Sequence, residues 1–124
     1  MTDLAPSVDD LDLCTGWVDV IAEADLEVEV GVPALVGAAA VAVVKTYAGE
    51  LFAVSNLDPR TGSSVMARGI VGTRGEIPTV ASPLYKEVYD LRTGVCLDDQ
   101  TKQLKTFEVR VAGGIVQVRG RGGG

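Results

Sequence analysis

Two loops decide the fold of this chain: SNLDPRTGSSV (55–65) and ASPLYKEVYDLRTG (81–94). Each loop follows a short apolar run that is typical of a β-strand. The first loop bends at Pro59 and recovers with Gly62, and the second closes on Gly94. Proline fixes φ and glycine adopts φ > 0 without strain, so both loops are predicted to be tight turns. We expect Gly94 to require that left-handed conformation.

Together, the two loops resemble the cluster-binding loops of Rieske iron–sulfur domains, which run C-P-H-R-G-x-x-L and C-P-W-H-G-W-x-F-D-L-x-T-G. The positions that match are Pro59, Gly62 and Val65 in the first loop and Pro83, Tyr89, Asp90, Leu91, Thr93 and Gly94 in the second. The resemblance implies an all-β, Rieske-like fold, which is an antiparallel β-sandwich or small barrels with one short helical turn.

The four ligand positions of the Rieske loops do not match, because this chain has Asp58, Arg60, Ser82 and Tyr85 there. A Rieske [2Fe–2S] centre takes two thiolates and two imidazoles, and the sequence contains no histidine. We therefore expect no iron–sulfur cluster. Two interpretations of these side chains remain open. They form a hydrogen-bonded network, with Arg60 pairing with Asp58 and the two hydroxyls as neutral partners, or they drifted after the cluster was lost.

One family with such loops is the small subunit of cytoplasmic NAD(P)H-dependent nitrite reductase, which this chain resembles over roughly residues 17–120. The stretches that carry the resemblance are FAVSNLDP (52–59), RGIVG (68–72), VASPLYKEVYDLRTGVCLDD (80–99) and VRVAGGIVQVRG (109–120). The resemblance implies a cytoplasmic accessory subunit with no catalytic residues and no cofactor of its own. Its partner would be the large subunit, which in that family carries FAD, a [4Fe–4S] cluster and siroheme and reduces nitrite to ammonium.

Four loop residues, Arg60, Leu84, Tyr85 and Lys86, are predicted to form a docking tip for that partner. Arginine and tyrosine are the residue types that dominate the energetics of protein interfaces. The alternative is that the loop shape is retained for folding alone. Two other functions remain open: a binding module with an unrelated partner, and an electron-transfer ferredoxin, which the missing ligands oppose.

The composition argues against several classes of protein. The 124 residues carry a net charge of −6, and an acidic surface repels nucleic acid. The apolar run ALVGAAAVAVV (34–44) is far shorter than the ~20 residues of a membrane helix, so we expect it to form core. Without histidine, the two cysteines cannot complete a four-ligand zinc site, and no Ser-His-Asp triad is available.

The chain is expected to hold one domain with a short segment on either side. We predict a flexible acidic tail over residues 1–13, a Rieske-like domain over 14–120 and a flexible glycine-rich end over 121–124. Cys14 and Cys96 are expected to be reduced and packed, although a disulfide between them remains open.

Alternating and β-branched residues predict short strands separated by turns. The strongest signal is the last pair, in which residues 107–111 alternate before a Gly-Gly turn into 115–119. Residues 34–44 are alanine-rich, but Gly37 and the valines favour a hairpin over a helix. Further strands are predicted at 17–20, 50–54, 69–72, 77–81 and 86–90, and a helical turn within 63–69, while 22–29 permits the start of another.

Overall fold

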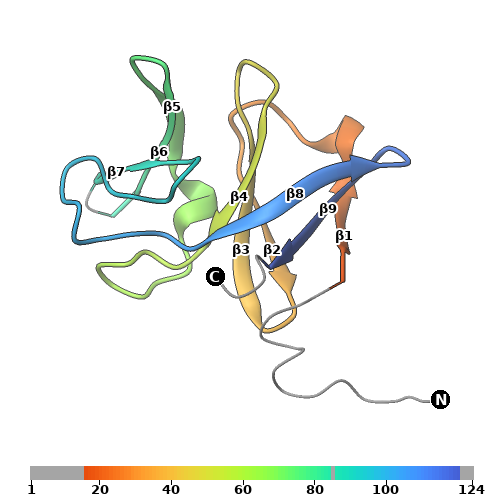
Figure 1. Ribbon diagram of the computed structural model, residues 1–124, viewed down its shortest axis with the longest axis horizontal. Helices are drawn as coiled ribbons and strands as arrows, with labels where there is room; N and C mark the ends of the chain where they lie inside the picture. Colours follow the sequence, from red (N-terminus) through yellow and green to blue (C-terminus); the bar gives the residue numbers. More distant parts are fainter. Residues whose placement is uncertain (1–15, 85, 121–124) are drawn as a thin grey trace.

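The computed structural model describes residues 16–84 and 86–120, and this part of the chain is all-β, as predicted (Figure 1). One sheet has six strands in the order β1-β9-β8-β4-β3-β2, and a second has three in the order β5-β6-β7. Neighbouring strands pair antiparallel. The strands are β1 Val18–Ala22, β2 Val32–Val36, β3 Ala39–Lys45, β4 Leu51–Ser55, β5 Ile70–Arg74, β6 Ile77–Ala81, β7 Val88–Asp90, β8 Thr106–Ala112 and β9 Ile115–Gly120.

The small sheet is inserted between two neighbouring strands of the large one, β4 and β8. The chain leaves the large sheet after Ser55 and returns at Lys105, and the Ser55 N–H donates to the Lys105 carbonyl at 2.8 Å. Everything between these residues forms the left-hand part of Figure 1. Both loops singled out from the sequence belong to this insertion, so the small sheet is what positions them.

Strand β3 explains why residues 34–44 read as apolar without a clear period. Val41 and Val43 face one hydrophobic cluster together with Phe107, while Ala42 and Val44 face the other. All four β3 residues are buried because the strand is covered on both sides. A strand buried on both faces gives a continuous apolar run in place of an alternating one. The predicted hairpin is confirmed, since β2 pairs with β3 from Val36↔Ala39 onward.

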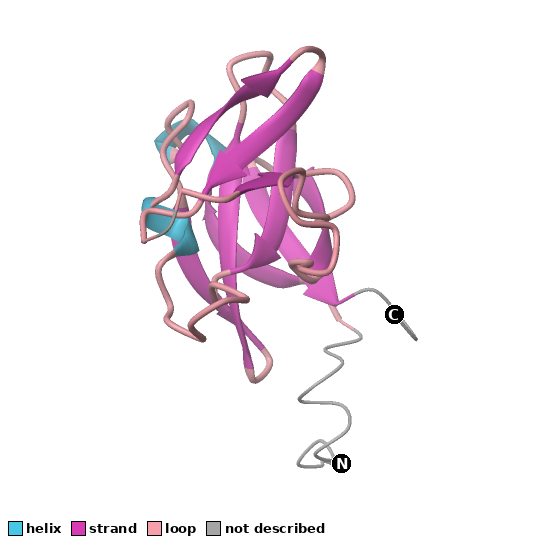
Figure 2. Cartoon of the chain, turned by 90° about the vertical axis from the view of Figure 1, so that its left-hand side faces the viewer, coloured by secondary structure: helices cyan, strands magenta, loops and turns pink. Residues whose placement is uncertain are grey.

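The described residues contain two 3₁₀ turns (Figure 2), one in each of the two stretches where the sequence permitted a helical turn. The turn η2, Met66–Arg68, lies inside the expected stretch and buries Met66 against the small sheet's cluster. The second turn is η1, Glu23–Asp25, where the Leu26 N–H donates to the Glu23 carbonyl at 3.2 Å. Leu26 is 3% exposed, so its burial holds this polar turn in place.

The N-terminal edge of the large sheet is fixed by an aromatic stack. The guanidinium carbons of Arg110 and Arg119 lie 4.2 Å and 4.5 Å from the centre of the Trp17 ring. Cation–π contacts of this kind contribute about 0.5–1 kcal/mol each at exposed sites. Trp17 directly precedes β1, which pairs with β9, so the stack joins the start of the domain to its last two strands.

Several sequence predictions fall on residues 1–15, 85 and 121–124, which lie outside the described residues. These are the two tails, Cys14 and Tyr85. Cys96 is a buried free thiol. Within the described ranges, no helix has the length and apolar character needed to cross a membrane.

Candidate functional site

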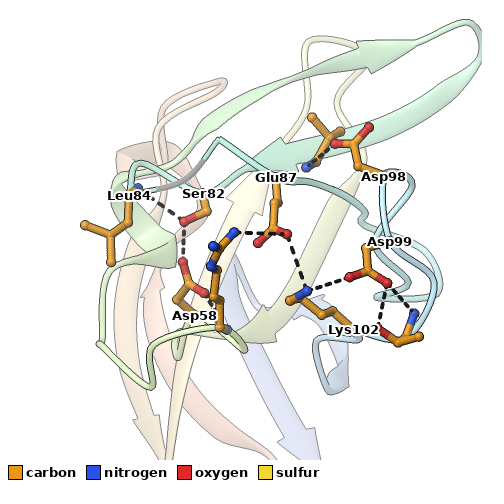
Figure 3. A network of polar contacts seen from close by, with 10 residues as sticks. Asp58, Ser82, Leu84, Glu87, Asp98, Asp99 and Lys102 are labelled. Atoms are coloured by element: carbon orange, nitrogen blue, oxygen red, sulfur yellow. Dashed lines mark hydrogen bonds and ion pairs between the residues drawn. The ribbon is translucent and has the colours of Figure 1, made fainter.

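The first ligand positions of the two Rieske-type loops lie against each other (Figure 3). Ser82 Oγ donates a hydrogen bond to Asp58 Oδ2 across the two loops. Asp58 is 0% exposed and Ser82 is 1% exposed, so this contact is shielded from solvent. Charge-assisted hydrogen bonds are stronger than neutral ones, especially in a medium of low dielectric constant. The pair therefore joins the loops at the place where the motif has its two cysteines.

Backbone hydrogen bonds shape the first loop around Asp58. The Gly62 N–H donates to the Asp58 carbonyl at 2.7 Å, and the Arg60 N–H donates to Asp58 Oδ1 at 2.7 Å. Gly62 adopts φ 76°, the conformation expected of the glycine in this motif. Asp58 is therefore held by its own turn before Ser82 reaches it.

The second loop closes in the same manner around Ser82. The Lys86 N–H donates to the Ser82 carbonyl at 2.9 Å, and the Leu84 N–H donates to Ser82 Oγ at 3.2 Å. Lys86 adopts φ 61°. Lys86 stands where the motif C-P-W-H-G has its glycine, so the turn keeps a left-handed residue although the glycine is gone.

Arg60 reaches a carboxylate that the sequence interpretation did not include. Its Nη1 lies 3.9 Å from Glu87 Oε2, whereas the expected contact with Asp58 is made by the Arg60 backbone N–H. Lys102 Nζ lies 3.6 Å from the same Glu87 oxygen and 2.6 Å from Asp99 Oδ2. Glu87 therefore connects the second loop to Arg60 of the first and to Lys102 of the segment before β8 (Figure 3).

Glu87 and Lys102 are the site residues that sequence reasoning missed. One signal was available, because Glu87 stands where the second-loop motif has its second tryptophan. A carboxylate at a position that the motif fills with a large apolar ring needs cationic partners when it is buried. The Glu87 side chain is 14% exposed and has two such partners. Nothing in the sequence around Lys102 marks it as one of them.

Two buried polar atoms near this network, the Tyr89 hydroxyl and Glu87 Oε1, lack a hydrogen-bond partner among the described residues. Tyr89 is 0% exposed. Burial raises the pKa of Tyr89 far above its ordinary value, and the negative charge of Glu87 adds to the effect. Tyr89 is therefore a neutral phenol and supplies no base near neutral pH.

The residues of the expected docking tip are exposed where the structure describes them. Leu84 is 46% exposed, Lys86 is exposed, and the Arg60 side chain is 49% exposed. Tyr85, the fourth member, lies outside the described residues. The two loops thus present a mixed apolar and cationic surface.

The side chains at the ligand positions do not fit a Rieske cluster. Asp58 and Ser82 are hydrogen-bonded to each other, and Arg60 is a permanent cation without a lone pair. The described cysteine, Cys96, is 0% exposed and packs in the cluster with Met66 and Tyr89. Within residues 16–84 and 86–120, no three His, Cys, Asp or Glu side chains gather as they would around a metal ion. The described residues at these positions thus supply hydrogen bonds and an ion pair between the two loops.

Known proteins share a similar architecture and a related sequence. The profile of the family described as "Rieske-like [2Fe-2S] domain" matches residues 16–119. The nitrite reductase (NADH) small subunit of Escherichia coli (strain K12) is 42% identical over 106 residues, which cover 84% of this chain and 97% of that protein. The NMR structure of the E. coli protein NirD is similar with a TM-score of 0.77 at 40% identity, over 85% of this chain and 96% of that one.

A further relative is a much longer protein. The nitrite reductase [NAD(P)H] large subunit of Klebsiella oxytoca is 32% identical to this chain over 90 residues. These residues are 73% of this chain and 9% of that protein. A domain similar to this chain is thus part of a single long polypeptide there.

Proposed function

Since the chain belongs to the Rieske-like [2Fe-2S] domain family and is a relative of the nitrite reductase small subunits, we propose that it is an accessory subunit. In this proposal it binds no cluster and docks on a nitrite reductase large subunit. The observation that carries the proposal is the 42% identity to a small subunit, which extends over 97% of that protein. Identity over nearly the full length of that small subunit favours the same role, because the matched region contains almost all of that protein.

Two features support the absence of a cluster. The four ligand positions hold Asp58, Arg60, Ser82 and Tyr85, none of which supplies a thiolate or an imidazole. In addition, the Asp58–Ser82 hydrogen bond already joins the loops, a connection that the metal makes in a Rieske centre. In this proposal the subunit transfers no electrons, and nitrite reduction takes place on the large subunit with its FAD, [4Fe–4S] cluster and siroheme, in the cytoplasm.

The Klebsiella oxytoca protein supports the partner. A domain similar to this chain is covalently joined there to the remainder of a nitrite reductase large subunit. Covalent linkage keeps two domains at a high effective concentration, which favours a contact between them. We propose that the separate chain makes the equivalent contact without the linkage.

The proposed contact is the docking tip formed by Arg60, Leu84, Tyr85 and Lys86. Leu84 offers an exposed apolar side chain, and the two loops also carry the exposed cations Arg60 and Lys86. Arg60 is also held by Glu87, which reduces the entropy that its side chain loses on binding. Arginine and tyrosine, two members of the tip, are residue types that are enriched in interface hot spots.

The absence of a cluster is tested by anaerobic reconstitution with iron and sulfide. We expect no visible absorption and no bound iron. The matched control carries Asp58→Cys, Arg60→His, Ser82→Cys and Tyr85→His together, which restores the four ligands on the same scaffold. A stoichiometric Rieske spectrum from the unaltered protein would overturn this part of the proposal and favour an electron-transfer ferredoxin.

Docking is tested by titrating the protein into the purified large subunit. Arg60→Glu or Tyr85→Ala should weaken binding by about 1–3 kcal/mol, as expected for a truncated hot-spot residue. Arg68→Glu is the control, because it makes the same charge change at an exposed position outside the tip. Circular dichroism verifies that each variant is folded. If the unaltered protein fails to bind the large subunit, the proposed function is wrong; if both tip variants bind normally, the contact lies elsewhere.

A further inference from the structure

A groove lies between two turns that are distant from the first Rieske-type loop. The β3–β4 turn (residues 46–50) and the β5–β6 turn stand at the top of Figure 1, whereas loop 55–65 lies at the lower left. A cavity of about 180 Å³ separates the two turns. The residues that matter for its chemistry are Glu29, Tyr47, Glu50, Val71, Glu76 and Pro78.

The groove has an apolar floor and an exposed aromatic wall. Val71 is 8% exposed and Pro78 is buried, and together they form the floor. Tyr47 is 86% exposed, which makes it the most exposed of the large hydrophobic side chains in the described part of the chain. The exposed ring offers apolar area that a binding partner can cover, and tyrosine is a residue type enriched at interface hot spots.

The rim of the groove is acidic and unneutralised. Glu29, Glu50 and Glu76 are exposed on it, and none forms an ion pair with another described residue. No lysine or arginine is among the described residues that line the groove. The cation next to the β5–β6 turn, Arg74, is bound instead to Asp98 at 3.1 Å. The rim therefore attracts positive charge, opposite in sign to the docking tip.

The wall that carries Tyr47 is already ordered. The Thr46 N–H donates to the Glu50 carbonyl at 2.8 Å, and the Glu50 N–H donates to Thr46 Oγ1 at 3.1 Å. Gly49 allows this tight turn with φ 90°. A turn fixed in this way loses little conformational entropy when a partner covers it.

We propose that this acidic groove binds an arginine- or lysine-bearing segment of the large subunit, with the cationic side chain on the Tyr47 ring and among the three glutamates. This inference rests on the proposed function and adds to it a second contact, which holds the subunit at the end away from loop 55–65. Arginine fits best, because its guanidinium stacks on an aromatic face and pairs with carboxylates at its edge.

The test is a titration of the protein into the large subunit at several salt concentrations. The double variant Glu50→Gln/Glu76→Gln and the single variant Tyr47→Ala should each weaken binding by about tenfold. The double variant should also reduce the salt dependence of the affinity, because fewer charges are neutralised. The matched control is Asp25→Asn/Glu27→Gln, which removes two exposed charges that do not line the groove. We expect the control to bind like the unaltered protein.

Each outcome separates this inference from the proposed function. If the unaltered protein binds and the groove variants bind equally well, the groove inference is overturned while the accessory role stands. Equal weakening by groove and control variants would attribute the effect to net charge and would also overturn the inference. If the unaltered protein does not bind, the proposed function and the groove inference fail together.

Discussion

Replacing Gly94 by alanine should be far more costly than the same change at Gly62. Both glycines have positive φ, 82° and 76°, so alanine at either site pays about 1–2 kcal/mol for the left-handed conformation. At Gly62 nothing else opposes a methyl group, because no heavy atom lies within 4 Å of its position. At Gly94 the methyl would overlap the Leu104 carbonyl oxygen and lie 3.0 Å from the Leu104 carbonyl carbon.

The clash at Gly94 cannot be relieved without breaking other contacts. The Leu104 N–H donates to the Gly94 carbonyl at 2.7 Å, and the Gly94 N–H donates to the Asp90 carbonyl at 2.7 Å. Moving Leu104 away weakens a backbone hydrogen bond, worth about 1 kcal/mol, and displaces a side chain that is 1% exposed. We therefore expect Gly94→Ala to lower the free energy of unfolding by about 3–5 kcal/mol and Gly62→Ala by about 1–2 kcal/mol.

Urea denaturation followed by circular dichroism compares the two variants directly, with the free energy taken from midpoint and slope. Equal losses for the two alanine variants would refute the reasoning, because they would mean that Leu104 yields at no cost. A Gly94→Ala variant as stable as the unaltered protein would refute it more strongly, since even the left-handed conformation would then be unnecessary.

Three further predictions concern the polar network. Ser82→Ala should lower the free energy of unfolding by about 1–3 kcal/mol, because it removes a partner of the buried Asp58 carboxylate. In a protein that already carries Asp58→Ala, the same substitution should cause little further loss of stability. Fully additive losses in this double-mutant cycle, measured by urea denaturation, would contradict the contact. Tyr89→Phe should raise the free energy of unfolding by up to about 1 kcal/mol, because it removes a buried hydroxyl without a described partner. Burial also raises the pKa of Tyr89 in the folded state, so the unaltered protein should lose stability relative to Tyr89→Phe as pH rises above about 10. Urea midpoints of the two proteins at high pH measure this difference. The hydrogen bond from Lys102 lowers the pKa of Asp99, so the stability that it contributes is present above the unfolded pKa of about 3.9 and is lost as pH falls below it. Lys102→Met should therefore make the free energy of unfolding fall less steeply between about pH 2 and 5. An unchanged pH dependence of the urea midpoints would contradict this contact.

The strands could be predicted because their signals are local. Residues 107–111 alternate in the sequence, and β8 pairs with β9 through Val109↔Val118 across a Gly-Gly turn. The hairpin at 34–44 followed from Gly37 and from the β-branched valines, although the two-sided burial of β3 obscured its period. Local propensity and pattern are sufficient when an element and its neighbour are joined by a short turn.

The contacts of the candidate site depend on segments that are far apart in the chain. Asp58 and Ser82 were singled out together from the two loop motifs, but their burial depends on packing that no local pattern reveals. Lys102 meets Glu87 only because the segment before β8 folds back over the second loop. The groove beside Tyr47 was likewise missed, because its two turns read in the sequence as ordinary turns.

The contacts of Trp17 with two arginines have a consequence for spectroscopy. Trp17 is the only tryptophan in the chain, and it lies beside β1, the outermost strand on one side of the large sheet. Its fluorescence therefore reports on the separation of β1 from β9, a local event that can precede global unfolding. A lower midpoint by fluorescence than by circular dichroism would reflect fraying of this edge and not a partly folded domain. Emission from Trp17 is for the same reason a poor monitor of loop 55–65, which lies far from β1 in Figure 1.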